Sequence, residues 1–63
     1  MNEDEELELE ALMRQRRSTE ARLNRALGEM LGTGNGAQEV IGAIEDMETV
    51  LRSIAATVAR IAS

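Results

Sequence analysis

A single glycine-rich segment, Gly32-Thr33-Gly34-Asn35-Gly36, interrupts a chain of 63 residues that is otherwise compatible with helix. The chain contains no proline, so no other position in it forces a helix to end. Glycine enters left-handed conformations without a steric cost, which makes Gly32 a suitable residue to follow a helix that ends near Leu31. Two long segments on either side of one short turn predict an all-α fold, an antiparallel two-helix hairpin.

Capping signals indicate where the two helices begin. Asn2 followed by Glu5 is the pattern of a capping box, and Asn35 followed by Gln38 repeats that pattern after the glycines. Acidic residues at 3–6 are also favoured by the dipole of a first helical turn. We therefore expect one domain over residues 1–63, with a helix over about 3–31, a turn at 32–35 and a second helix over about 36–62.

The second helix carries the strongest periodic pattern. Its apolar residues recur at alternating spacings of four and three, the heptad pattern of a helix that packs against other helices. The positions in this pattern are Val40, Ile44, Met47, Leu51, Ile54, Val58 and Ile61. Other apolar residues flank them, so the stripe is broader than one neighbouring helix can cover.

The same spacing drawn through the first helix is apolar only at its two ends. It passes through Leu9, Met13, Arg16, Glu20, Leu23, Leu27 and Met30. Arg16 and Glu20 are four residues apart and opposite in charge, so we expect them to pair as a polar layer. Folding the hairpin about its turn places this layer beside Met47 and Leu51. A lone hairpin is then expected to leave Met47, Val50 and Leu51 poorly covered.

A second chain is expected to cover this surface. A chain of this size rarely builds a core worth more than about 3–5 kcal/mol, and without Cys or His it lacks the usual disulfide and zinc supports. A homodimer that completes a four-helix bundle or coiled-coil assembly is the simplest arrangement, and a different helical protein is the alternative. The expected partner interface consists of Val40, Ile44, Met47, Val50, Leu51, Ile54, Val58 and Ile61.

Small residues near the turn lead to a further expectation about packing. Gly28 and Gly42 lack side chains, so we expect the two helix backbones to approach closely at these positions.

The residue types argue against an enzyme. No His or Lys is present to activate a Ser or Thr hydroxyl. The carboxylates of Glu45, Asp46 and Glu48 lack the His that helical di-metal sites also recruit, and we expect them to be solvated. The glycine segment follows a helix and lacks the Lys of a phosphate-binding loop. We therefore expect no catalytic, cofactor-binding or metal site, and no small-molecule substrate.

Charge limits the classes of partner. The net charge is −5, which disfavours nucleic acid and anionic membranes. One feature points the other way, a set of arginines expected on the outer side of the first helix: Arg14, Arg17, Arg22 and Arg25. We expect Glu10 to pair with Arg14 and Glu29 with Arg25, leaving a solvated face. No apolar run approaches the ~20 residues of a membrane span, and we expect a soluble, cytoplasmic protein without membrane insertion.

One stretch resembles a known protein family. Residues 21–27, followed by Met30-Leu31-Gly32 and the apolar second helix, resemble the small helical-hairpin co-chaperones of type III secretion needle subunits. That resemblance implies a cytoplasmic chaperone that holds an aggregation-prone subunit in solution. The sequence thus leads first to a non-enzymatic protein–protein interaction module that self-associates or docks helices. Its alternatives are such a chaperone or adaptor, and a small RNA-binding bundle that uses the Arg face.

Overall fold

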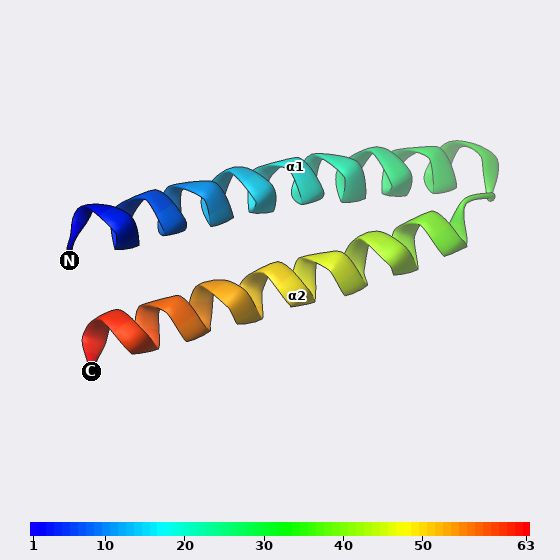
Figure 1. Ribbon diagram of the computed structural model, residues 1–63. Helices are drawn as coiled ribbons and strands as arrows, with labels where there is room; N and C mark the ends of the chain where they lie inside the picture. The colour runs from blue at the N-terminus through cyan, green and yellow to red at the C-terminus, as the bar shows by residue number, and fades with distance from the viewer.

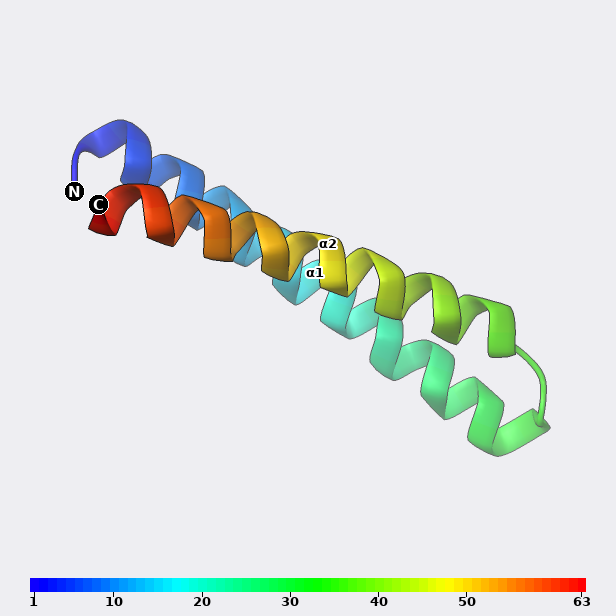
Figure 2. The same ribbon diagram turned by 90° about the horizontal axis from the view of Figure 1, so that it is seen from below.

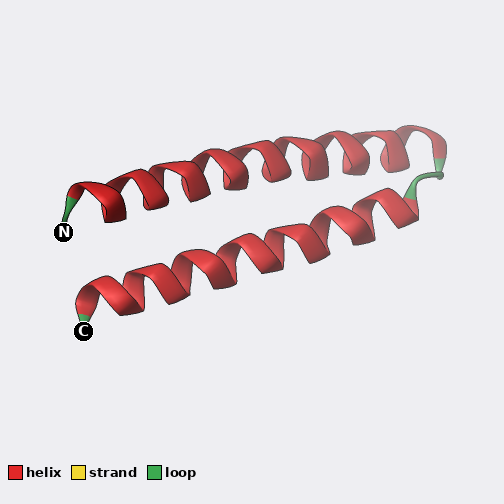
Figure 3. Ribbon diagram, in the orientation of Figure 1, coloured by secondary structure: helices red, strands yellow, loops and turns green.

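The chain forms two antiparallel helices in a computed structural model that describes all residues, 1–63. Helix α1 spans Glu3–Thr33 and helix α2 spans Ala37–Ala62. Figure 1 shows the two helices side by side, joined by one tight turn, with both chain termini at the opposite, open end. Figure 3 shows helix throughout apart from the turn and the two ends. The predicted all-α hairpin is confirmed.

The two helices wind around each other over the length of the hairpin. They run next to one another in Figure 1, whereas Figure 2 shows α2 crossing over α1 near the middle. The body measures 47 × 15 × 11 Å between Cα atoms, so it is a long, thin slab with two broad sides. A slab of this shape has little interior.

The start of α1 follows the sequence prediction. The side chain of Asn2 accepts a hydrogen bond from the backbone N–H of Glu5 at 2.8 Å, and the Glu5 carboxylate accepts one from the backbone N–H of Asn2 at 2.9 Å. These two bonds complete the capping box, which satisfies backbone donors that the first turn leaves free.

The turn differs from the prediction at both of its ends. Helix α1 continues two residues past Leu31, through Gly32, and ends at Thr33. Gly34 caps it with a left-handed φ of 78°, and its backbone N–H donates to the Met30 carbonyl at 2.8 Å. The predicted cap at Asn35 is wrong, because Gly36, with φ 95°, precedes α2 and offers no side chain. Only glycine takes both conformations without strain, so the second and third glycines of the segment shape the turn.

The helices face each other through residues that repeat at heptad spacing. On α1 the buried or half-buried members of this seam are Leu9, Leu12, Arg16, Thr19, Leu23 and Ala26. On α2 they are Val40, Ala43, Met47, Val50, Ile54, Thr57 and Ile61. Five residues of the chain are buried, and most of them are small: Ala26, Val40, Ala43, Val50 and Thr57.

The predicted seam of α2 is therefore wrong at every second position. Ala43, Val50 and Thr57 face α1, with exposed fractions of 0, 2 and 3%, where the heptad pattern predicted Ile44, Leu51 and Val58. Each predicted residue directly follows the one that is buried. Helix α1 shows the same rotation, since Leu12, Thr19 and Ala26 face inward in place of Met13, Glu20 and Leu27. The smaller side chain of nearly every such pair lies inside, which lets the two helices pack closely.

The glycines near the turn do not provide that close approach. A Cβ atom built on Gly28 or on Gly42 meets no heavy atom within 4 Å. Both positions point away from the seam, so the prediction of a close backbone contact there is wrong. The small seam residues Ala26 and Ala43 serve that role instead.

Candidate interaction surface

The two broad sides of the hairpin differ because of how each helix is rotated. A residue that directly follows a seam residue lies 100° further around its helix. A local two-fold axis, perpendicular to the plane of the two helices, relates the helices of an antiparallel pair. Rotation about this axis exchanges the helices but keeps every residue on its own side of the plane. Residues that follow the seam therefore emerge on one broad side from both helices, and residues that precede the seam emerge on the other.

The side formed by residues that follow the seam is rich in large apolar side chains, and we call it the apolar side. Leu51 and Val58 are each 48% exposed and Ile44 is 43% exposed, although each neighbours a buried residue. The exposed members of the apolar side are Met13, Leu27, Leu31, Ile41, Ile44, Leu51 and Val58. Met30, at the edge of the seam, is also exposed. The hairpin covers these side chains only in part.

The side formed by residues that precede the seam is polar and is held by ion pairs between the helices. Arg22 of α1 pairs with Asp46 of α2, and Glu8 of α1 pairs with Arg60 of α2. The members of each pair lie equally far from Gly34 along the chain, so both pairs belong to one register. This register differs by one residue from the one that the sequence predicted. The hairpin thus has its charge links on one side and its exposed apolar residues on the other.

Glu8 has a perturbed acid–base equilibrium on this polar side. Its hydrogen bond to Arg60 lowers the pKa of the carboxyl, partial desolvation raises that pKa, and a hydrogen bond from the buried Thr57 hydroxyl lowers it further. The net effect is a lowered pKa, because the guanidinium and hydroxyl donors favour the carboxylate form.

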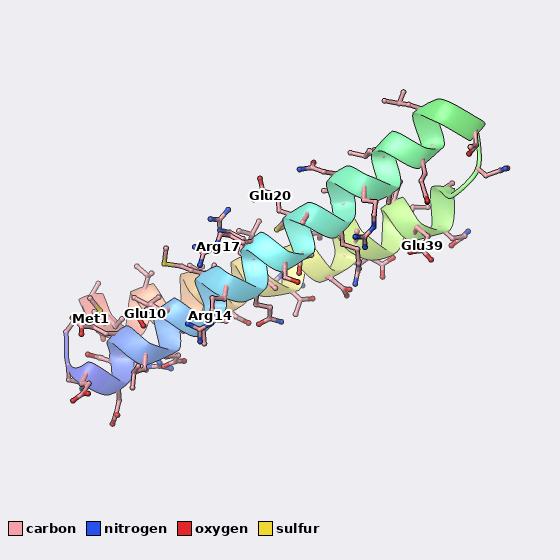
Figure 4. The ribbon with its side chains drawn as sticks, turned by 90° about the horizontal axis from the view of Figure 1, so that it is seen from above. Met1, Glu10, Arg14, Arg17, Glu20 and Glu39 are labelled. Carbon is pink, nitrogen blue, oxygen red and sulfur yellow. The ribbon has the colours of Figure 1, made fainter.

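Charged residues occupy the middle of the apolar side on α1. The predicted pair is confirmed: the Arg16 guanidinium lies 3.0 Å from the Glu20 carboxylate. Arg16 is half-buried in the seam while Glu20 is exposed, so the aliphatic stem of Arg16 is available to cover the seam near Val50. In Figure 4 Arg17 and Glu20 project from one edge of α1, and Arg14 projects from the other edge.

A shallow hollow lies at the open end of α1 on the apolar side. It is lined by Met1, Glu6, Leu9, Glu10 and Met13. Three of these five lining residues are apolar, and Leu9 also belongs to the seam. The hollow therefore continues the apolar side toward the chain termini.

The predicted partner interface divides into two groups. Val40 and Val50 are buried in the hairpin, and three others, Met47, Ile54 and Ile61, are half-buried in its seam. The expectation that the hairpin leaves Val50 uncovered is wrong, because the rotation of α2 turns that residue toward α1. Ile44, Leu51 and Val58 are exposed and remain available to a partner.

Sequence reasoning omitted several residues of the apolar side. The heptad pattern places Met13 and Leu27 in the seam of α1, but both are exposed, as is Ile41 of α2. The sequence indicates only that a helix ends near Leu31, whereas the structure leaves 90% of this residue exposed. The signal that identifies most of them is size, since the larger residue of nearly every adjacent pair is the one left outside.

The arginines do not form the single outer face that the sequence predicted. Arg22 is half-buried and tied to Asp46, while Arg14 and Arg17 project from opposite edges of α1 (Figure 4). The predicted pairs Glu10–Arg14 and Arg25–Glu29 are not among the four ion pairs of the structure. Of the predicted acidic cluster, Asp46 pairs with Arg22 and Glu48 with Arg52 at 3.4 Å.

Two wider properties bear on the class of site. No group of carboxylate side chains is arranged to hold a metal ion. Neither helix combines the length and the apolarity that crossing a lipid bilayer requires.

Comparisons with models of protein families, with curated proteins and with solved structures found no match to this chain. The resemblance to type III secretion co-chaperones therefore stays a prediction.

Proposed function

We propose that this protein is a non-enzymatic interaction module that self-associates through its apolar side. Two copies pack with these sides together and complete a four-helix bundle. The observation that carries the proposal is the exposure of Ile44, Leu51 and Val58 beside a seam whose fully buried residues are mostly small. Burying them against another copy removes apolar surface from water, which is the main driving force of association.

The accessible surface of the hairpin supports this proposal. It amounts to 4593 Å², whereas a compact monomer of 6.9 kDa exposes roughly 4000 Å². One broad side, 47 Å by 15 Å between Cα atoms, has an area of about 700 Å², close to the ~800 Å² that each partner contributes to a standard interface. The apolar side is therefore large enough to support a stable dimer.

A second copy fits this side better than a basic or acidic partner does. The charges in its middle are of both signs, because Arg16, Arg17 and Glu20 come from α1 and Glu48 comes from α2. A two-fold interface presents the same patch from both partners, so it favours patches that carry complementary groups within themselves. The four-helix bundle is the form in which such a pair of hairpins closes its core.

The mass in solution tests the proposal, together with a matched pair of charge substitutions on α2. Leu51→Glu places a carboxylate in the middle of the apolar side, whereas Ser53→Glu places the same group two residues away on the polar side. We expect sedimentation to give a dimer for the natural chain and for Ser53→Glu, and a monomer for Leu51→Glu at micromolar concentration. A folded monomer for the natural chain at that concentration excludes self-association.

A further inference from the structure

The exposed large residues of α2 form a row that is symmetric about its middle. Ile44, Leu51 and Val58 follow one another at intervals of seven residues. Seven residues are close to two helical turns, so these side chains lie in line along the apolar side. We infer that a second copy docks antiparallel on this row, with the two-fold axis at Leu51. Leu51 then meets its own counterpart, and Ile44 meets Val58. This inference rests on the self-association proposed above and specifies its orientation.

The corresponding row on α1 disfavours the other two-fold arrangement of a four-helix bundle. In that arrangement the two-fold axis runs along the length of the bundle, and α2 of one copy packs beside α1 of the other. The row on α1 is Met13, Glu20 and Leu27, so its middle residue is a carboxylate. Packing the α2 row on it would desolvate Glu20 against apolar side chains, which is unfavourable for a charged group. The antiparallel arrangement instead pairs the two α2 rows and places α1 of one copy on α1 of the other, so Glu20 does not meet the α2 row.

A protrusion and a hollow on α1 match under the same axis. Leu31 is 90% exposed and lies near the turn, whereas the hollow lined by Met1, Glu6, Leu9, Glu10 and Met13 lies at the open end. Leu31 and Glu10 are separated by whole heptads, so both belong to the same side of α1. Antiparallel docking brings the turn end of one copy to the open end of the other. Leu31 of each copy then faces the hollow of its partner.

Cysteine cross-linking distinguishes the arrangements, because the natural chain contains no cysteine. The variants Leu51→Cys, Ile44→Cys and Val58→Cys each place one thiol on the α2 row. Ser53→Cys, on the polar side, is the control for disulfides that form through random collisions. Under mild oxidation at micromolar concentration, we expect Leu51→Cys to form a covalent dimer by itself. We expect Ile44→Cys and Val58→Cys to form one only when mixed, because two copies of residue 44 lie about 21 Å apart across the axis.

The outcomes separate this inference from the proposed function. Sedimentation of the reduced variants shows whether each is still a dimer. A dimer in which Leu51→Cys stays unlinked, or in which Ile44→Cys links to itself as readily as Leu51→Cys does, overturns the antiparallel arrangement while self-association stands. If the natural chain and the reduced variants are all monomers, both the arrangement and the self-association are wrong. Linking of Ser53→Cys at the same rate as Leu51→Cys also overturns the arrangement, since it reports random encounters.

Discussion

The hydroxyl of Thr57 on α2 donates a hydrogen bond of 3.2 Å to the carboxylate of Glu8 on α1. Thr57 is the one buried polar residue of the chain, at 3% exposed. Arg60 binds the other oxygen of the same carboxylate, so Glu8 links two residues of α2 to the open end of α1. This cluster joins the ends of the helices where the chain termini leave them free to separate.

Acid is expected to weaken this link. The pKa of Glu8 is lower in the folded chain than its ordinary value of 4.5, so folding favours the ionised form. Its contribution to stability is complete above the unfolded pKa and is lost as the pH falls from there through the lower folded pKa. Thermal melting followed by circular dichroism between pH 7 and pH 2 measures this loss. Glu8→Gln should melt lower at pH 7 and lose less on acidification than the natural chain.

The control for this experiment is Glu45→Gln, which removes an exposed carboxylate that makes no ion pair. That variant should keep the full acid dependence of the natural chain. Equal acid dependence in the Glu8 and Glu45 variants would show that the Glu8 cluster contributes nothing measurable.

Replacing the two helical glycines should stabilise the hairpin. Gly28 and Gly42 lie inside helices, and an added Cβ meets no atom within 4 Å. Alanine there should raise the free energy of unfolding by about 1 kcal/mol per site, because glycine is a poor helix former. Gly34→Ala should instead lower it by roughly 1 kcal/mol, since φ there is 78°. Urea unfolding of the three variants measures these changes in the free energy of unfolding. A loss of stability in Gly42→Ala would reveal a contact at that position in the assembly.

Neighbouring substitutions on α2 should separate folding from association. Val50→Ala removes a side chain that is 2% exposed within the hairpin, and should cost about 2 kcal/mol. Leu51→Ala removes one that is 48% exposed, so its cost should be small in dilute solution and grow with protein concentration. Urea unfolding at two protein concentrations a hundredfold apart measures the loss of stability in both variants. An equal loss for Leu51→Ala at both concentrations would contradict the assignment of this residue to the dimer interface.

Removing the charged layer should strengthen the assembly. Replacing Arg16 and Glu20 together by Leu breaks the ion pair at 3.0 Å and continues the apolar side between Met13 and Leu27. We expect a higher melting temperature or a larger oligomer, because polar residues near a seam often set register at a cost in stability. The matched control replaces Arg25 and Glu29, also four residues apart, by Leu on the other side of α1. A lower melting temperature at unchanged mass in the Arg16 and Glu20 variant would contradict this prediction.

Sequence reasoning predicted the larger features of the fold because they depend on local interactions. The capping box of Asn2 and Glu5 involves residues three apart, and the pair of Arg16 and Glu20 involves residues four apart. Both were predicted and both form. The turn was placed correctly, but its details were not, because several neighbouring glycines can each adopt a left-handed conformation. Gly34 and Gly36 do so, whereas Gly32 remains helical.

The sequence by itself determined that the chain forms two antiparallel helices with a heptad seam. Only the tertiary structure decided which of two adjacent heptad rows on α2 lies inside. The row of Ala43, Val50 and Thr57 and the row of Ile44, Leu51 and Val58 have the same period and differ by a rotation of 100° about the helix. Apolarity alone favours the second row. Close packing of two helices favours the first, because small side chains let them approach and bring Glu8 to Arg60 and Arg22 to Asp46.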